Sequence, residues 1–227
     1  MLGIYDSGSG GLHALATIKA KAPDANILYR GDLSRAPYGT REREDLIQII
    51  KQNIEHFHAL GCTHILVACM TASSLTPDLP PEYKEGVFPI VDYVGARSLA
   101  LSRGGRIGIV STSRTMKEGR LRNFLLAHGA PVTESEADAL VPLAEENASP
   151  CDDRIGEIVA QATRIHREAK VDTLVLGCTH FPFFSDTFHK VMGEDVTLVP
   201  SGEVGAEEFL KQIPKDVLKG QGHIHFI

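Results

Sequence analysis

The sequence predicts an α/β protein built from two similar halves, each with a mainly parallel sheet flanked by helices. Short apolar runs alternate along the chain with amphipathic stretches of helical period, which is typical of βα units in a parallel sheet. The order of elements also restarts midway, because Leu2–Tyr5 and Arg106–Val110 are similar glycine-containing strands. The 227 residues allow one large domain or two small ones.

The first half is expected to form strands at short apolar runs that end at turn residues. These strands are Leu2–Tyr5, Asn26–Tyr29, His64–Ala68 and Val87–Val91. A helix is expected at Leu12–Lys21, ahead of Pro23. A longer helix is expected at Arg41–Leu60, where apolar residues form one stripe and Gly61 stops the pattern. Between them Gly31–Thr40 is expected to be a loop.

The second half repeats this pattern. Its expected strands are Arg106–Val110, Val132–Glu134, Thr173–Gly177 and Val196–Val199, and its expected helices are Thr115–His128 and Asp152–Lys170. A further helix is expected after this half, at Val204–Leu210. Pro182 suits the first turn of a further helix. The tail Gly222–Ile227 alternates polar and apolar residues and is expected to be an edge strand.

The repetition indicates an internal duplication. Gly3 corresponds to Gly108, and Cys69 corresponds to Cys178, with a short insertion between the two matches. We expect a first half of residues 1–94 plus about 201–227, and a second half of residues 95–200. Two facing α/β halves would bring their strand ends to one shared cleft, the usual place for a ligand in such sheets.

Composition excludes several classes of protein. The net charge is −6, with 43% hydrophobic and 23% charged residues, so neither a nucleic-acid nor an anionic-membrane surface is expected. No apolar run is long enough to span a membrane. The N-terminal residues do not resemble a signal peptide, so we expect a cytoplasmic protein with its cysteines as thiols.

Cys69 and Cys178 each follow a buried strand and stand among polar residues, whereas Cys62 and Cys151 resemble ordinary core residues. Backbone N–H groups at a helix start favour a thiolate, so the pKa of each strand-end thiol is expected to fall. Two such thiols on opposite sides of a carbon can invert its configuration. A thiolate removes a proton from one face, and the opposite thiol returns one.

Other chemistries remain open at these residues. A zinc site would use Cys69, Cys178, His180 and Asp6, although none of them has metal-ligand spacing within one element. A Cys178–His180 nucleophile pair is another option, but side chains two apart at a strand end need not meet. The glycine run at Gly8 could bind phosphate or carboxylate through free N–H groups.

The acidic candidates each have an ordinary structural explanation as well. Asp6 either caps the following helix or orients a thiol. Asp32 is either a loop cap or an acid at the cleft, and Glu145 is either a solvated helix residue or part of the site. His180 is either a hydrogen-bonded buried histidine or the proton partner of Cys178.

A set of motifs then gives the chain a family resemblance. They occur in the order LGIYDSGSGGL from Leu2, GD-x-x-R-x-PYGT from Gly31, C-x-TA from Cys69, VPL-x-E from Val141 and GCTHFP from Gly177. With these motifs the chain resembles the cofactor-independent aspartate/glutamate racemases, and among them those that act on glutamate. The resemblance implies two pseudo-symmetric α/β domains with the active site in the cleft between them.

The resemblance also implies roles for single residues. Cys69 and Cys178 would be the acid–base thiols, with Asp6 assisting Cys69 and with His180 and Glu145 assisting Cys178; Asp32 would be a supporting carboxylate. The residues that would line the substrate are Ser7, Pro37, Tyr38, Gly39, Met70, Thr71, Thr112 and Thr179. No cofactor and no metal are implied, the partner is a small amino acid, and a homodimer is the one assembly that we consider.

Met70 departs from this resemblance, because the family usually has asparagine there. An amide can donate to a carboxylate and accept from an ammonium group, whereas a thioether does neither well. Losing one hydrogen bond to a charged group predicts binding weaker by roughly ten- to hundredfold. The expected activity is racemisation of glutamate for peptidoglycan precursor synthesis. The alternatives are racemisation of aspartate or another amino acid, a thiol-dependent hydrolase or lyase, and a non-catalytic ligand-binding member.

Overall fold

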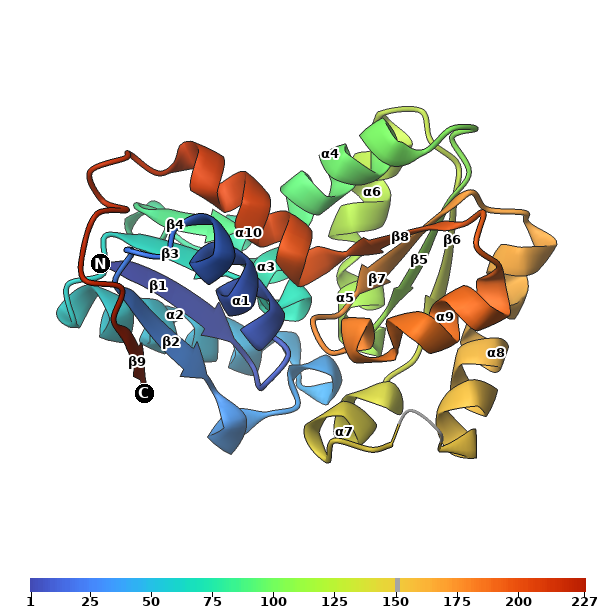
Figure 1. Ribbon diagram of the computed structural model, residues 1–227, viewed down its shortest axis with the longest axis horizontal. Helices are drawn as coiled ribbons and strands as arrows, with labels where there is room; N and C mark the ends of the chain where they lie inside the picture. Colours follow the sequence, from blue (N-terminus) through green and yellow to red (C-terminus); the bar gives the residue numbers. More distant parts are fainter. Residues whose placement is uncertain (150–151) are drawn as a thin grey trace.

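The computed structural model describes residues 1–149 and 152–227. It contains two parallel sheets that lie side by side, each with helices on both faces (Figure 1). The α/β class and the two similar halves predicted from the sequence are therefore confirmed.

Four strands of each sheet have the same order, and the first sheet has β9 as a fifth strand. The first sheet has the order β4-β3-β1-β2-β9 and consists of β1 (Leu2–Asp6), β2 (Ile27–Gly31), β3 (His64–Val67), β4 (Val87–Pro89) and β9 (Ile224–Phe226). The second sheet has the order β6-β5-β7-β8 and consists of β5 (Ile107–Ser111), β6 (Val132–Glu136), β7 (Thr173–Gly177) and β8 (Thr197–Pro200). The C-terminal strand β9 pairs with β2 at the edge of the first sheet, as its alternating pattern predicts.

The strand register shows the duplication directly. In the first sheet Gly3 lies opposite Ile65, and in the second sheet Gly108 lies opposite Leu174. Cys69 and Cys178 follow Ile65 and Leu174 at the same spacing along the chain, so they occupy equivalent positions. This equivalence is the one that the sequence comparison of the two halves predicts.

The helices of the first half cover the first sheet, with one exception described below. They are α1 (Leu12–Lys21), α2 (Arg43–Ala59), α3 (Met70–Leu75) and α4 (Val91–Leu101). The 3₁₀ turns among them are η1 (Leu33–Arg35), η2 (Tyr38–Thr40), η3 (Thr76–Asp78) and η4 (Pro81–Tyr83). Sequence analysis did not predict α3 or α4. Every residue of α3 is buried, so this short helix has no amphipathic period.

The helices of the second half follow the predicted positions more closely. They are α5 (Ser113–Glu118), α6 (Arg120–Ala127), α7 (Leu140–Glu145), α8 (Asp153–Glu168), α9 (Ser185–Met192) and α10 (Ser201–Gln212), with the 3₁₀ turn η5 (Phe181–Phe184). The single helix expected at Thr115–His128 is two helices. They are divided at Gly119, whose φ of 64° is left-handed and ends α5.

Two helices cross from one half to the other. Helix α4 follows β4 but packs on α6 and on the second sheet, and α10 follows β8 but packs on α1 of the first half (Figure 1). The two crossing helices also touch each other, and a Cβ added at Gly205 would lie 2.2 Å from Ile90 Cγ2. The domain limits expected from the sequence stay a prediction, and the expected limit at Val94 falls inside α4.

The crossing helices give the two halves a shared core. One buried cluster contains side chains from both sheets and from both crossing helices, among them Ile4, Val91, Val175 and Phe209. Two further clusters each lie within one half. The shared cluster anchors the two halves to each other beneath their strand ends.

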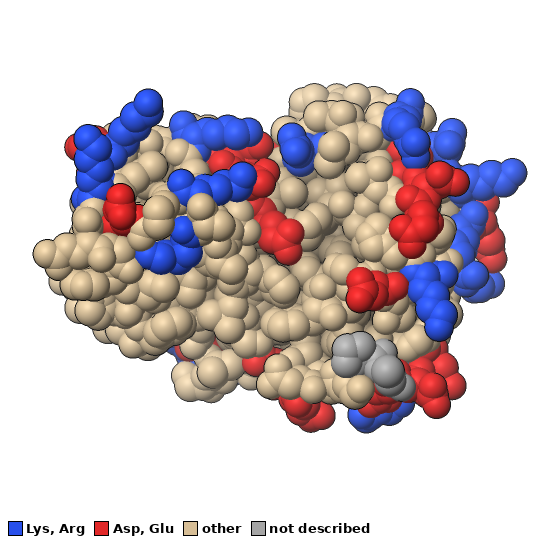
Figure 2. Space-filling view, in the orientation of Figure 1, with Lys and Arg blue, Asp and Glu red and all other residues tan. Residues whose placement is uncertain are grey.

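The described surface is of mixed charge. On the face drawn in Figure 2, acidic and basic side chains are interspersed, and the described residues there form no uniform basic field of the kind that nucleic acid requires. None of the described helices is both long and apolar enough to cross a membrane.

Candidate active site

A cleft of about 380 Å³ lies where strand ends of the two halves meet. Its walls come from the loops after β1, β2, β3, β5, β6 and β7 and from α7. The lining residues are Ser7, Leu33, Ala36, Pro37, Tyr38, Gly39, Thr40, Cys69, Met70, Thr71, Thr112, Asp138, Val141, Pro142, Glu145, Cys178, Thr179 and His180. Most residues expected at the site therefore line one cavity, and the exceptions are Asp6 and Asp32.

Cys69 caps the start of α3, just after β3. Its thiol is buried and donates to Ser7 Oγ at 3.5 Å. Burial, together with the nearby charge of Asp6, raises the pKa of Cys69 to about 12. The Ala72 N–H favours the thiolate as expected for a helix start, but burial outweighs it. The expectation of a lowered pKa is therefore wrong for Cys69.

Cys178 has an imidazole as its neighbour. Its Sγ lies 3.6 Å from His180 Nδ1, and His180 Nε2 donates to Glu145 Oε1 at 2.5 Å. The two side chains do meet, although residues two apart at a strand end need not. The chain leaves the strand at Gly177 and turns at Thr179, which brings the two side chains onto one side.

His180 and Glu145 form a charged pair. Burial alone would lower the pKa of His180, but the contacts with Cys178 and Glu145 outweigh it and raise that pKa to about 11. The hydrogen bond from His180 lowers the pKa of Glu145 to about 2. Each shift favours the charged form of its group, so the pair is an imidazolium and a carboxylate at neutral pH.

Glu145 is also held by the other half of the molecule. Its Oε1 accepts a hydrogen bond from the Ser9 N–H at 2.8 Å, which joins the loop after β1 to the end of α7. The Gly8 N–H donates to Asp6 Oδ1 at 3.0 Å. Binding of phosphate or carboxylate by N–H groups of this loop was one option that the sequence left open, and the protein's own carboxylates occupy these two N–H groups.

Asp6 does not line the cleft, and among the described residues its carboxylate makes no hydrogen bond to the Cys69 thiol. Its side chain is fully buried, and Oδ2 accepts from Thr179 Oγ1 at 3.0 Å. Burial raises the pKa of Asp6. Asp6 therefore connects the loop after β1 to the Cys178 loop across the two halves, while Ser7 is the described partner of Cys69.

Asp32 does not line the cleft. It holds the loop Pro37–Gly39, which forms one edge, or lip, of the cleft. Its carboxylate accepts from Tyr38 Oη at 2.5 Å, from Arg35 Nε at 2.7 Å and from Asn53 Nδ2 at 3.2 Å. Tyr38 in turn bonds Tyr5 at 2.7 Å. These bonds, which outweigh burial, lower the pKa of Asp32. They fix Pro37–Gly39, which do line the cleft.

Hydroxyl groups form a cluster at one end of the cleft. Thr71 Oγ1 lies 3.1 Å from Thr112 Oγ1 and 2.9 Å from Thr115 Oγ1, and the latter two are 2.9 Å apart. Thr71 and Thr112 were expected at the site, whereas Thr115 was missed. The Thr112-x-x-Thr115 spacing, in which Thr112 caps α5, is the signal that could have found it.

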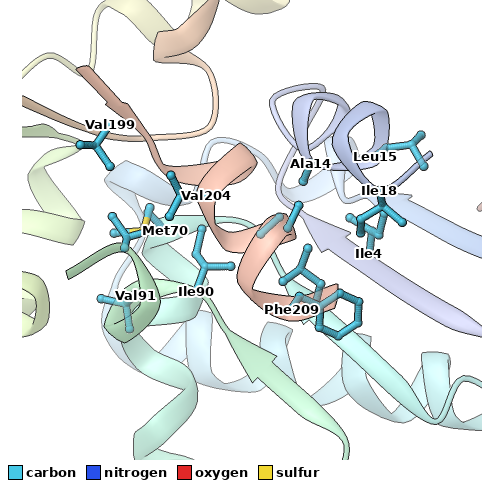
Figure 3. Close-up of a cluster of buried hydrophobic side chains, with 14 of the residues drawn as sticks. Ile4, Ala14, Leu15, Ile18, Met70, Ile90, Val91, Val199, Val204 and Phe209 are labelled. Carbon is cyan, nitrogen blue, oxygen red and sulfur yellow. The ribbon is translucent and has the colours of Figure 1, made fainter. Parts of the chain in front are cut away.

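Met70 has two environments. It lines the cleft, and it also belongs to the core shared by the halves, where it lies beside Ile90, Val91 and Val204 (Figure 3). The thioether therefore adds to the packing between the halves at a position where an amide was expected.

The remaining lining residues were not predicted. They are Leu33, Ala36, Thr40, Asp138, Val141 and Pro142. Asp138 is the second residue after β6, so the rule that parallel strand ends converge on a site could have found it. The others, apart from Thr40, are apolar, and local sequence does not distinguish them from ordinary loop residues.

Neither of the other two cysteines belongs to the described cleft lining, and the zinc alternative finds no ligand group among the described residues. Cys62 is buried in the core of the first half, as expected, and Cys151 lies outside the described residues. Within residues 1–149 and 152–227, no three His, Cys, Asp or Glu side chains are grouped so as to hold a metal ion. The zinc alternative therefore has no ligand set in this part of the chain.

Comparison with known proteins decides the family. The model of the Asp/Glu/Hydantoin racemase family matches residues 13–209. The chain is 34% identical to a glutamate racemase of Corynebacterium kroppenstedtii, over 94% of this chain and 74% of that protein. It is 32% identical to a glutamate racemase of Aquifex aeolicus, over 97% of this chain and 84% of that protein.

The chain belongs to the Asp/Glu/Hydantoin racemase family. The fold agrees, because the glutamate racemase isoform RacE1 of Bacillus anthracis superimposes with a TM-score of 0.91 at 27% identity, over 100% of this chain and 86% of that one. The resemblance drawn from the sequence motifs is therefore confirmed, and the chain is a racemase-family isomerase.

Proposed function

We propose that this protein interconverts L- and D-glutamate, with Cys69 and Cys178 as paired acid and base, and so supplies D-glutamate for peptidoglycan precursors. One observation carries the proposal. Two cysteines at equivalent positions of the two halves line one cleft. A substrate held between them would expose opposite faces of its α-carbon to the two thiols.

The proposed reaction needs one thiolate and one thiol. The thiolate removes the α-proton, the electron pair stays on the α-carbon next to the carboxylate, and the opposite thiol returns a proton to the other face. The pair then holds the reverse protonation, so the same residues act in the opposite direction on the product. Neither sulfur forms a bond to carbon.

The residues beside the two cleft cysteines support a mechanism that needs one thiolate and one thiol. The His180 imidazolium lies beside Cys178, and Glu145 holds that positive charge in position. Ser7 is a neutral partner for Cys69, whose thiol form is favoured by burial. The hydroxyl cluster supplies donors for a substrate carboxylate.

Incubation with D- or L-glutamate in deuterated water tests the activity. We expect both enantiomers to form, with deuterium at the α-carbon, as read by proton NMR and by optical rotation. Absence of both signals contradicts glutamate racemisation. Repeating the measurement with aspartate and neutral amino acids tests the alternative that the apolar Met70 wall favours another substrate.

Serine variants test the two-thiol mechanism. We expect Cys69→Ser and Cys178→Ser each to lower kcat by at least about a hundredfold in both directions, because the hydroxyl is a far weaker base than a thiolate. Cys62→Ser is the matched control, since Cys62 is buried outside the cleft. Full activity of either cleft variant would rule out paired thiols, and a covalent cysteine adduct seen by mass spectrometry would favour a hydrolase or lyase.

A further inference from the structure

Asp138 is a carboxylate in the cleft wall that the proposed mechanism does not use. It lies between β6 and α7 and is half-buried. One oxygen, Oδ2, accepts from the Ser113 N–H at 2.9 Å, which holds the side chain against the start of α5. The other oxygen, Oδ1, lies 2.9 Å from the point where a Cβ on Gly39 would stand.

The charge of Asp138 is not balanced within the cleft. In the part of the chain that the structure describes, no Lys, Arg or His lies within ion-pair distance of this carboxylate, and Oδ1 accepts no hydrogen bond. The other lining carboxylate, Glu145, is paired with His180 and the Ser9 N–H. Asp138 is therefore the place in the described cleft wall where a cation would be favoured.

An α-amino acid brings such a cation. Its ammonium and carboxylate groups are attached to one carbon, so a site for both needs donors and an acceptor within a few ångström of each other. Thr112 and Asp138 both line the cleft. Thr112 Cβ and Asp138 Oδ1 each lie 2.9 Å from the point where a Cβ on Gly39 would stand, so the two side chains flank the same part of the wall. Met70, which also lines the cleft, offers only a weakly accepting thioether.

We propose that Asp138 Oδ1 binds the α-ammonium group of the amino-acid substrate, while the threonine hydroxyls beside it bind the carboxylate. This inference rests on the proposed function, since it assigns a residue to the same substrate. Asp138 would thereby select amino acids over diacids of the same length that lack the ammonium group.

Asp138→Asn tests the assignment with little change in shape. The amide oxygen can still accept from the Ser113 N–H, so the contact with α5 is kept and only the charge is removed. We expect glutamate to bind about ten- to hundredfold more weakly, because a charge-assisted hydrogen bond is lost. The expected change appears in KM and in the dissociation constant measured by calorimetry, with kcat changed less than about threefold.

Glutarate, a diacid without an ammonium group, is the second probe. We expect its inhibition constant to be unchanged or lower in Asp138→Asn, because the variant removes a repelling charge and no attractive contact. Glu136→Gln is the matched control, since Glu136 is exposed, lies two residues away and does not line the cleft. It should leave both ligands unaffected.

The other outcomes overturn the assignment. Equal weakening of glutamate and glutarate, with a lower Tm, would make Asp138 a structural cap of α5. Tighter glutamate binding would mean that Asp138 opposes the substrate's second carboxylate, and no change would mean that it does not touch the substrate. If the wild type binds glutamate without α-proton exchange, the proposed function fails while the binding comparison still decides the role of Asp138. If it binds no glutamate, both fail.

Discussion

Cys69 and Cys178 have equivalent backbone positions but different neighbours. Cys178 stands beside the His180 imidazolium, whereas Cys69 stands beside a serine hydroxyl and is fully enclosed. The duplicated fold thus brings the two thiols to one cleft, and the residues around them make the two environments unequal. The charged pair of His180 and Glu145 stands beside Cys178 only.

This pair predicts a pH-dependent stability. His180 has a raised pKa of about 11, so its contribution is full below its unfolded value of 6.5 and is lost as pH rises toward 11. Glu145 has a lowered pKa of about 2, so its contribution is full above 4.5 and is lost as pH falls toward 2. We expect Glu145→Gln to lower the free energy of unfolding by about 1.5–3 kcal/mol near pH 5.5.

Urea unfolding of the wild type and of Glu145→Gln across the pH range measures this effect. The difference in free energy of unfolding between the two proteins should be largest between about pH 4.5 and 6.5 and should narrow at lower and at higher pH. Glu168→Gln is the control, because Glu168 pairs with Arg164 on the surface and should show almost no difference. A difference that stays constant with pH would mean that shape, not charge, causes the loss.

At the level of single residues, the sequence predicted the groups that follow strand ends. Cys69, Cys178, Ser7 and Thr112 line the cleft because consecutive parallel strands end at one edge. Asp32 was also expected at the site, but Tyr38, Arg35 and Asn53 draw its carboxylate away from the cleft. Those partners are distant in sequence or follow a turn, so local pattern could not find them.

The secondary-structure elements that hold the halves together are the crossing helices α4 and α10. They meet where Gly205 lies against Ile90, and a Cβ on Gly205 would approach Ile90 Cβ to 2.6 Å. The β-carbon of Ile90 cannot move away without shifting the start of α4. The glycine is therefore required by the close approach of the two helices, despite its low helix propensity.

We expect Gly205→Ala to lower the free energy of unfolding by about 1–3 kcal/mol, because overpacking exceeds the gain in helix propensity. Gly156→Ala is the matched control, since Gly156 is also helical and its added Cβ would meet nothing within 4 Å. That variant should raise the free energy of unfolding by about 0.5–1 kcal/mol. Both are measured by denaturant unfolding.

A double-variant cycle with Ile90→Ala locates the effect. The cost of Gly205→Ala should fall in the Ile90→Ala background, because the clashing atoms are absent there. An equal cost in both backgrounds would show that Gly205 is constrained by something other than this contact.

In the molecule as a whole, the cleft is closed by polar contacts between the halves. Arg114 of α5 donates to the Arg41 carbonyl at 2.9 Å and pairs with Glu42 at 3.4 Å. Arg43 of α2 pairs with Glu118 of α5 at 3.2 Å. These contacts lie on the side of the cleft formed by η2 and α5, so they hold the lip at Gly39 against the second half.

We expect Arg114→Ala to raise KM for glutamate by roughly three- to fivefold with little change in kcat, because a looser lip weakens ground-state binding by about 1 kcal/mol. Steady-state kinetics at low and high salt measure the effect, which should shrink as salt screens the wild-type pairs. Arg154→Ala is the control, since its pair with Asp152 lies within one half. A kcat loss without a KM change would contradict a role in closure.

The sequence by itself determined the fold class, the duplication and the pair of cysteines, because these follow from the apolar period of strands and helices and from residues at strand ends. Tertiary structure decided the rest. Four features depend on neighbours that are far away in the chain. They are the crossing of α4 and α10, the high pKa of Cys69, the position of Asp32 outside the cleft lining and the exposure of Asp138 to the cleft. Burial and charge at a site are sums over such neighbours, and local sequence does not specify them.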